Sequence, residues 1–305
     1  MPDNSRSPAD GGALVNGLKT GVLLAGLGGL IVAVAGIIGG GSSGALMIGL
    51  AIALVMVGGS YWFSGKLALT AARAKVISRD DNPQFYGMVE SLARRAGLPM
   101  PLVAISPSEQ PNAFATGRGP RHAVVCATQG LLDSMPSREI EAVMAHEMMH
   151  VKHRDILIGS VAAAIATAIS FVAQMAMFSA LFGGRNDDRD SSPVGTLAVA
   201  LLAPIAASLM QMAVSRSREF EADRGAAELL GSGDGLADAL GRIETLAARC
   251  PMVVNPAQAS AYIHNPLAEA RGAQGQKMSK LFSTHPATEE RIRRLRAMSP
   301  AGVTA

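Results

Sequence analysis

The 305-residue sequence is poor in charged and in aromatic residues. Only 17% of its residues are charged and 4% are aromatic, whereas 49% are hydrophobic. This composition argues against an ordinary soluble domain and favours a membrane protein. The apolar residues are mainly aliphatic or small, which suits closely packed membrane helices.

Cysteine and clustered basic charge are also scarce. Cys126 and Cys250 are far apart in sequence and form no short metal-binding or redox spacing, so we expect both to be reduced and structural. The net charge is only +3, and no basic run with interleaved aromatics occurs. Nucleic acid is therefore not an expected partner.

Four stretches contain no charged residue at all: residues 20–41, 45–63, 156–182 and 194–214. Each is about as long as a helix that crosses a bilayer. The first lacks a cleavage site before a polar mature domain, so a retained anchor is favoured over a cleaved signal peptide. The last two could instead be buried helices of a large soluble core, but their length favours membrane spans.

The positions of the basic residues predict the orientation of these spans. Basic residues follow the second span, precede the third and follow the fourth: Lys66, Arg73, Lys75, Arg79, Lys152, Arg154, Arg216 and Arg218. By the positive-inside rule these flanks face the cytoplasm. We therefore expect a cytoplasmic tail (1–19), two membrane hairpins, and a cytoplasmic domain in two parts (64–155 and 215–305), with both termini cytoplasmic.

The first polar part predicts a mainly α fold with a small antiparallel β-sheet. Residues 82–99 have helical spacing and end in a Gly-Leu-Pro stop. Short apolar runs at 101–106, 112–117 and 122–127, separated by turn residues, predict strands. Residues 134–155 open with Ser and Pro and then keep apolar residues at helical spacing, which predicts a second helix.

This second helix carries His146, Glu147 and His150 in the order H-E-x-x-H. Residues four apart lie one above the other on a helix, so both imidazoles can bind one zinc ion. Glu147 can then take a proton from a water molecule on the metal. A chance match is the alternative, but it is expected in about one percent of such chains or fewer.

A zinc protease needs a third protein ligand, and residues 215–230 offer one. Glu219 and Asp223 are again four apart. Glu219 can complete a His, His, Glu set, and Asp223 can accept an imidazole N–H, that of His146 being favoured. The alternative is a solvated acidic helix face, which the upstream H-E-x-x-H makes less plausible.

Three further residues have weaker signals. His153 is expected to be an exposed polar residue rather than a ligand. Asp155 could orient His150 or cap the next span, and we favour a structural role. His285, before a predicted terminal helix, would usually be structural too.

In their order along the chain, these motifs resemble the HtpX-type membrane zinc metalloproteases, relatives of the prenyl-protein (CAAX) proteases. The motifs are "NAFATG", "HEMMH", "SREFEAD" and "THPATEERI" together with the paired hydrophobic spans. The resemblance implies a gluzincin-like protease domain interrupted by transmembrane helices, with one Zn²⁺ per chain bound by His146, His150 and Glu219. It implies that Glu147 is the catalytic base.

The resemblance also implies a substrate-binding edge strand, along which a substrate segment adds as a further strand. Its residues are Asn112, Ala113, Phe114 and Ala115. His285 becomes a candidate to stabilise the oxyanion or to control access. "HEMMH" departs from many relatives, which have a small residue before the second histidine; this affects packing more than ligation.

By the same resemblance, the expected function is quality control and stress response in a bacterial inner membrane, by cleavage of misfolded or damaged membrane proteins on the cytoplasmic side. A dedicated prenyl-protein protease is one alternative, although four candidate spans are few for it. A silent zinc-binding scaffold is another, although it has no use for Glu147. A transporter is disfavoured because the spans contain no ionisable residue.

Overall fold

The computed structural model describes residues 41–159, 216–250, 262–263 and 286–299, together with scattered positions between 18 and 36. Within these ranges lie α2 (Ser43–Ala71), α3 (Pro83–Ala96), α4 (Gln129–Ser134), α5 (Ser137–Lys152), α8 (Arg216–Leu230), α9 (Asp234–Ala247) and α12 (Thr288–Ala297). The strands are β1 (Lys75–Val76), β2 (Leu102–Ser106), β3 (Ala113–Gly117) and β4 (Ala123–Thr128), and a 3₁₀ turn covers Pro120–His122. The expected spans at 156–182, beyond residue 159, and at 194–214 lie outside the described residues, as does His285.

The chain forms a mixed sheet in the order β1-β2-β4-β3, which corrects the expectation of an antiparallel sheet. The three predicted strands are present, but β2 and β4 run parallel, with Val103 opposite Val125. The chain leaves β2 and forms β3 one position away from it in the sheet. β4 then pairs antiparallel with β3 as a hairpin and fills the position between β2 and β3. The spacing of apolar runs predicts where strands lie but not their order in space.

Local signals set the ends of the helices near the sheet. The Asn82 side chain accepts a hydrogen bond from the Phe85 N–H at 3.1 Å, and Gly97 ends α3 in the left-handed conformation, with φ of 69°. α5 begins only at Ser137, later than predicted, because Met135 precedes Pro136 and is extended rather than helical.

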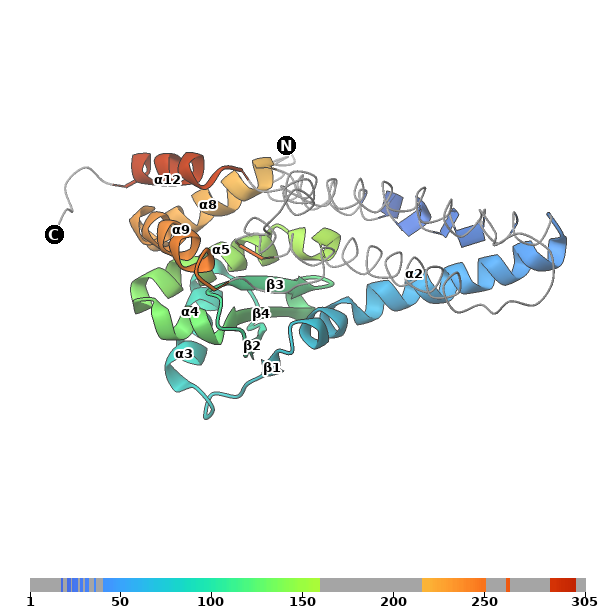
Figure 1. Ribbon diagram of the computed structural model, residues 1–305, viewed down its shortest axis with the longest axis horizontal. Helices are drawn as coiled ribbons and strands as arrows, with labels where there is room; N and C mark the ends of the chain where they lie inside the picture. Colours follow the sequence, from blue (N-terminus) through green and yellow to red (C-terminus); the bar gives the residue numbers. More distant parts are fainter. Residues whose placement is uncertain are drawn as a thin grey trace, which may run out of the picture.

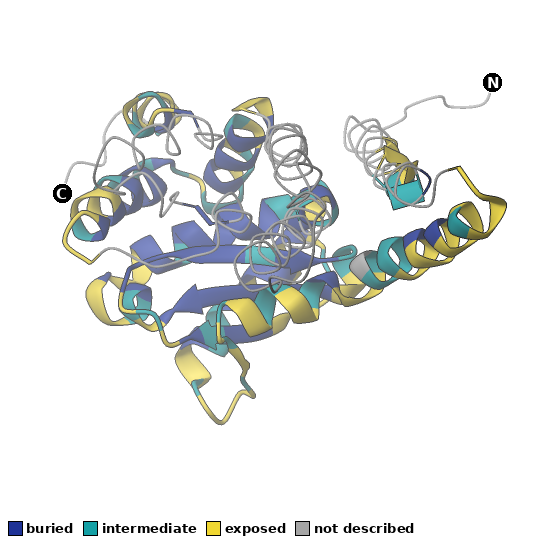
Figure 2. Cartoon of the chain, turned by 45° about the vertical axis from the view of Figure 1, so that its right-hand side comes forward, coloured by how far each residue is buried: buried dark blue, intermediate teal, exposed yellow. Residues whose placement is uncertain are grey.

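Helices cover both faces of the sheet (Figure 1). α5 lies against one face and is itself covered by α8 and α9, while α12 packs on α9. Eleven of the 16 residues of α5 are buried, so this helix forms the centre of the core (Figure 2). The other face packs Ala104, Phe114, Val124 and Cys126 against the C-terminal end of α2.

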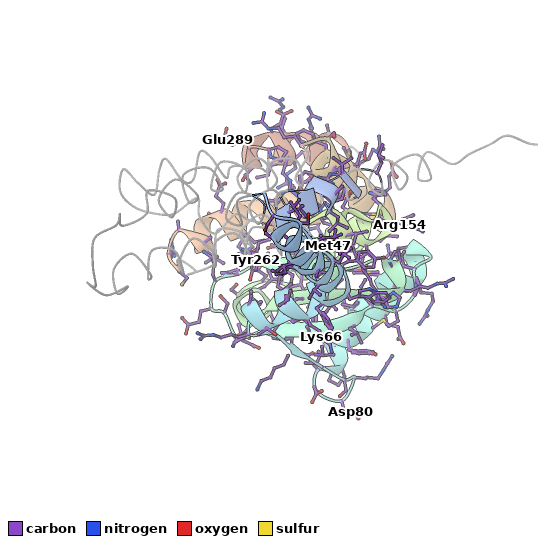
Figure 3. All side chains as sticks on the ribbon, turned by 90° about the vertical axis from the view of Figure 1, so that its right-hand side faces the viewer. Met47, Lys66, Asp80, Arg154, Tyr262 and Glu289 are labelled. Atoms are coloured by element: carbon purple, nitrogen blue, oxygen red, sulfur yellow. The ribbon has the colours of Figure 1, made fainter. Side chains whose placement is uncertain are left out.

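α2 extends well beyond the sheet (Figure 1), and Figure 3 looks along it, with Met47 labelled near its N-terminal end. Positions from the first apolar stretch run beside it, where Gly28 faces Ala53 and Val57. Among the described residues, no single helix meets the length and composition of a membrane span. The two parts of α2, Ser43–Gly59 and Tyr61–Ala71, bent by 62°, meet them only when taken together.

Candidate active site

The site is built on α5, where the four-residue spacing places His146 and His150 on one face. Their Nε2 atoms lie 3.1 Å apart, and the rings meet edge to face with centroids 4.7 Å apart. His146 is only 1% exposed. Two imidazole nitrogens thus converge on one point beneath α8.

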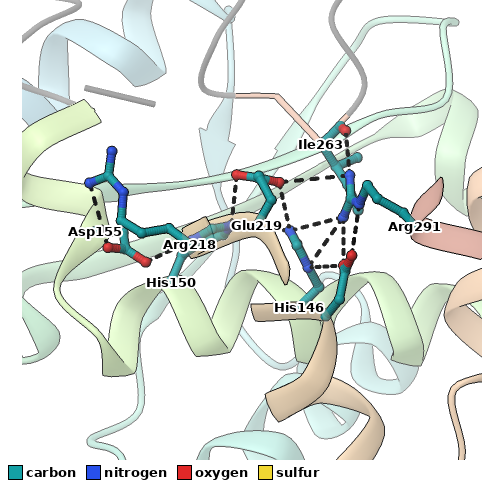
Figure 4. A network of polar contacts seen from close by, with 8 residues as sticks. His146, His150, Asp155, Arg218, Glu219, Ile263 and Arg291 are labelled. Atoms are coloured by element: carbon teal, nitrogen blue, oxygen red, sulfur yellow. Dashed lines mark hydrogen bonds and ion pairs between the residues drawn. The ribbon is translucent and has the colours of Figure 1, made fainter. Parts of the chain in front are cut away.

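Glu219 of α8 faces these two nitrogens (Figure 4). Its carboxylate oxygens lie 3.7 Å from His146 Nε2 and 3.6 Å from His150 Nε2. All three ligand atoms lie within 4.8 Å of one another. Ligands about 2.1 Å from a tetrahedral zinc ion are about 3.4 Å apart, so this donor set fits zinc in both chemistry and spacing.

A carboxylate faces the second nitrogen of each histidine. His146 Nδ1 lies 3.0 Å from Asp223 Oδ1, and His150 Nδ1 lies 3.1 Å from Asp155 Oδ2. Such contacts fix the ring orientation and direct each Nε2 toward the centre. The structure therefore pairs Asp223 with His146 as the sequence suggested, and it places Asp155 in the orienting contact rather than in the structural role we favoured.

The two histidines have opposite electrostatic surroundings. Burial and the neighbouring charges of His150 and Arg291 lower the pKa of His146 to about 4, so this ring is neutral at pH 7. Burial also acts to lower the pKa of His150, but Asp155 and Glu219 outweigh it and raise that pKa to about 9. Binding a cation at the shared centre therefore requires His150 to release a proton.

Glu147 lies on the same helix turn and is only 2% exposed. Burial, with the nearby Glu219 carboxylate, raises the pKa of Glu147 to about 7, although His150 and Arg291 act to lower it. A backbone hydrogen bond from Ala115 of β3 also holds its carboxylate. A carboxylate with a pKa near neutrality is suited to accept and return a proton.

The sequence analysis missed Arg291 of α12 as a residue of the site. It is 2% exposed and donates two hydrogen bonds to Asp223, from Nε at 2.9 Å and from Nη2 at 2.7 Å. Its Nη1 also lies 3.7 Å from Glu219 (Figure 4). The available signal was amphipathic spacing, because Arg291 and Leu295 are the two buried residues of α12 and lie four apart.

The structure also places two other features named in the sequence analysis, His153 and the edge segment at residues 112–115. His153 is half-buried rather than exposed, burial lowers its pKa, and it is not part of the ligand cluster. Asn112 to Ala115 do lie at a sheet edge, since β3 is the last strand of the sheet. Asn112, just before β3, bonds inward to Thr128 of β4: its N–H donates to Thr128 Oγ1, and its carbonyl accepts from the Thr128 N–H.

Comparison with known proteins identifies the family of this chain. The family model described as peptidase family M48 matches residues 80–299, a range that holds every residue of the site. The chain belongs to peptidase family M48. The family match makes it a metalloprotease, which implies a bound metal ion and protein substrates.

Relatives within the M48 family extend over nearly the whole chain. The protease HtpX homologues of Ralstonia nicotianae and Burkholderia ambifaria are each 49% identical over 293 residues, which is 95% of this chain and 99% of theirs. The crystal structure of S. mikatae Ste24p is 20% identical with a TM-score of 0.48, and the match covers 92% of this chain and 65% of that one. The HtpX resemblance drawn from the motifs is thus confirmed, and the family match with the HtpX homologues supports a membrane-associated metalloprotease.

Proposed function

We propose that the protein is an integral-membrane zinc endopeptidase that cleaves misfolded or damaged membrane proteins on the cytoplasmic side of a bacterial inner membrane. The convergence of His146, His150 and Glu219 beside the buried Glu147 carries this proposal. A structural zinc site closes its coordination with protein ligands, whereas three ligands and an adjacent base suit a catalytic one.

His146, His150 and Glu219 would hold the zinc ion. When bound, zinc would act as a Lewis acid and lower the pKa of a coordinated water to about 7. Asp223 and Asp155 hold the two imidazoles from their Nδ1 atoms, and Arg291 holds Asp223. The ligand set is therefore anchored from α5, α8 and α12 at once.

Glu147 is the proposed general base. Its carboxylate takes a proton from the attacking water and delivers it to the nitrogen of the departing amine. Burial supports this role, because it brings the pKa of Glu147 close to 7 and lets one group serve both transfers. His285, outside the described residues, remains a candidate for the oxyanion or for access control.

The membrane part of the proposal is supported by α2. Its large apolar residues are exposed around the helix, among them Leu54 at 66%, Val55 at 74% and Trp62 at 63%. A helix that is hydrophobic all round needs an apolar environment, which a bilayer provides. The cytoplasmic placement of both termini and of residues 64–155 and 215–305 follows from the positive-inside rule.

The test uses detergent-purified protein, an unfolded membrane-protein substrate, and zinc content measured on the same sample. We expect Glu147→Gln to keep its zinc and lose cleavage by at least about a hundredfold, the scale of general acid–base catalysis. Glu219→Gln should lose the metal as well as the activity. Glu221→Gln is the matched control, because this carboxylate is exposed on the same helix.

Two outcomes would contradict the proposed function. If wild type binds zinc and cleaves nothing, the protein is a zinc-binding scaffold. If it cleaves only prenylated C-terminal peptides and leaves unfolded membrane proteins intact, it is a dedicated processing protease instead.

A further inference from the structure

The outer side of β3 is already in use. Tyr262 forms an antiparallel bridge with Phe114, and the Ile263 N–H donates to the Ala113 carbonyl at 3.0 Å. β3 is the last strand of the sheet, so this pairing takes the edge that a substrate strand would need. The paired position is next to Ala115, whose backbone holds Glu147.

Both side chains of the dipeptide are anchored. Tyr262 is 4% exposed and its ring meets Phe114 edge to face, with centroids 5.1 Å apart. It shares an apolar cluster with Cys126 and the C-terminal end of α2, while Ile263 joins the main core on the other face. Alternating side chains on opposite faces are typical of an added β-strand.

The main chain of the dipeptide is also tied to the ligand network. The Ile263 carbonyl accepts a hydrogen bond from Arg291 Nη1 at 3.5 Å, and the same nitrogen lies 3.7 Å from Glu219 (Figure 4). The dipeptide therefore spans from the edge strand to the proposed zinc ligands.

We propose that Tyr262–Ile263 is an internal pseudosubstrate strand, which a substrate must displace from β3 before it is cleaved. The substrate then places an aromatic side chain in the pocket that Tyr262 vacates. The inference rests on the proposed protease function. A strand edge pairs with one strand at a time, so the internal strand and a substrate exclude each other. Substrates that add to an edge gain affinity from backbone hydrogen bonds and specificity from side-chain pockets.

A reversible lock tests the displacement step. The Ile263 N–H bonds to Ala113 rather than to Phe114, so Phe114 and Tyr262 are a non-hydrogen-bonded pair with Cα atoms about 4.5 Å apart. That spacing permits a disulfide. The variant carries Phe114→Cys and Tyr262→Cys in a Cys126→Ala, Cys250→Ala background, because Cys126 lies opposite Phe114 on β4.

We expect oxidation to lower cleavage at least tenfold and reduction to restore it. The single Phe114→Cys variant in the same background controls for oxidation itself. If the oxidised double variant cleaves as fast as its reduced form, the substrate does not use this edge and the proposal is overturned.

Release of the strand tests the same idea from the opposite side. Ile263→Pro removes the N–H that bonds to Ala113, whereas Ile263→Ala removes the side chain but keeps that hydrogen bond. We expect kcat/KM to rise about three- to tenfold in the proline variant relative to the alanine variant, the factor by which one backbone hydrogen bond shifts an equilibrium. Equal or lower activity in the proline variant, with zinc retained, would show that the dipeptide is a structural strand.

Peptide binding separates this inference from the proposed function. In a Glu147→Gln background, a fluorescent extended peptide should bind to the reduced lock variant and not to the oxidised one, whether or not any variant cleaves. In the Glu147→Gln protein without the cysteine substitutions, a peptide with tyrosine at the pocket position should bind about three- to tenfold tighter than the same peptide with alanine there. Binding without cleavage in the Glu147-intact protein would contradict the protease function alone, and binding to the oxidised lock would contradict the pseudosubstrate alone.

Discussion

α5 and α2 differ in the opposite way from what their compositions suggest: the more polar helix is buried and the more apolar helix is exposed. α5 carries histidines and glutamates, yet most of it is buried, because α8, α9 and the sheet surround it. α2 is far more apolar, yet Val55 and Trp62 are largely exposed. The difference shows that burial among the described residues follows tertiary contacts rather than the hydrophobicity of a helix, and under the proposed function the exposed apolar residues of α2 would face lipid.

The largest expected effect comes from breaking the buried charge network next to α5. Arg291→Met leaves Asp223 buried without its guanidinium partner, which should lower the free energy of unfolding by about 3–5 kcal/mol. Chemical unfolding in detergent measures this change. Arg293→Met on the same helix is the control, because Arg293 is 77% exposed; equal effects of the two changes would refute the network's importance.

The next prediction concerns the exposed apolar surface of α2. Val55→Arg should cost about 3 kcal/mol if this side chain faces the bilayer core, and should reduce the membrane-bound fraction after alkaline extraction. Leu102→Arg, on an exposed position of β2, should leave that fraction unchanged. A membrane-bound fraction unaffected by Val55→Arg would place α2 outside the lipid.

A smaller effect is expected where α8 packs on α5. A methyl group at Gly225 would lie 2.8 Å from the sulfur and 2.9 Å from the Cγ of Met149, next to the proposed zinc ligand His150. Gly225→Ala should therefore destabilise the protein by about 1–3 kcal/mol. Gly87→Ala in α3 meets nothing within 4 Å and should stabilise by about 0.5–1 kcal/mol, so unfolding curves of the two variants should move in opposite directions.

The smallest effect is expected at the surface of the protease domain. Arg79 and Glu90 form an ion pair in which both side chains remain exposed to solvent, at 54% and 38%. Arg79→Ala should change the free energy of unfolding far less than Arg291→Met does, and less still at high salt, because solvent screens an exposed ion pair. A change as large as that of Arg291→Met would contradict the view that burial decides the strength of ion pairs here.

Local signals predicted much of the fold. The three strand segments and the helices around residues 82–99 and 215–230 were found from turn residues, capping residues and periodicity. The sheet order was not, since the parallel pairing of β2 with β4 depends on how the intervening loop packs. Asp155 was underrated for a similar reason, because its contact with His150 lies beyond the end of α5.

The sequence by itself determined that His146 and His150 share one helix face, that Glu147 stands beside them, and that Glu219 and Asp223 repeat this spacing on another helix. These are consequences of the 3.6-residue helical period, which acts over a few residues. Only the tertiary structure decided that Glu219 meets the two histidines, that Arg291 holds Asp223, and that Ile263 pairs with the edge of β3. Such contacts join segments far apart in the chain, and they form only when the packing of the whole core brings those segments together.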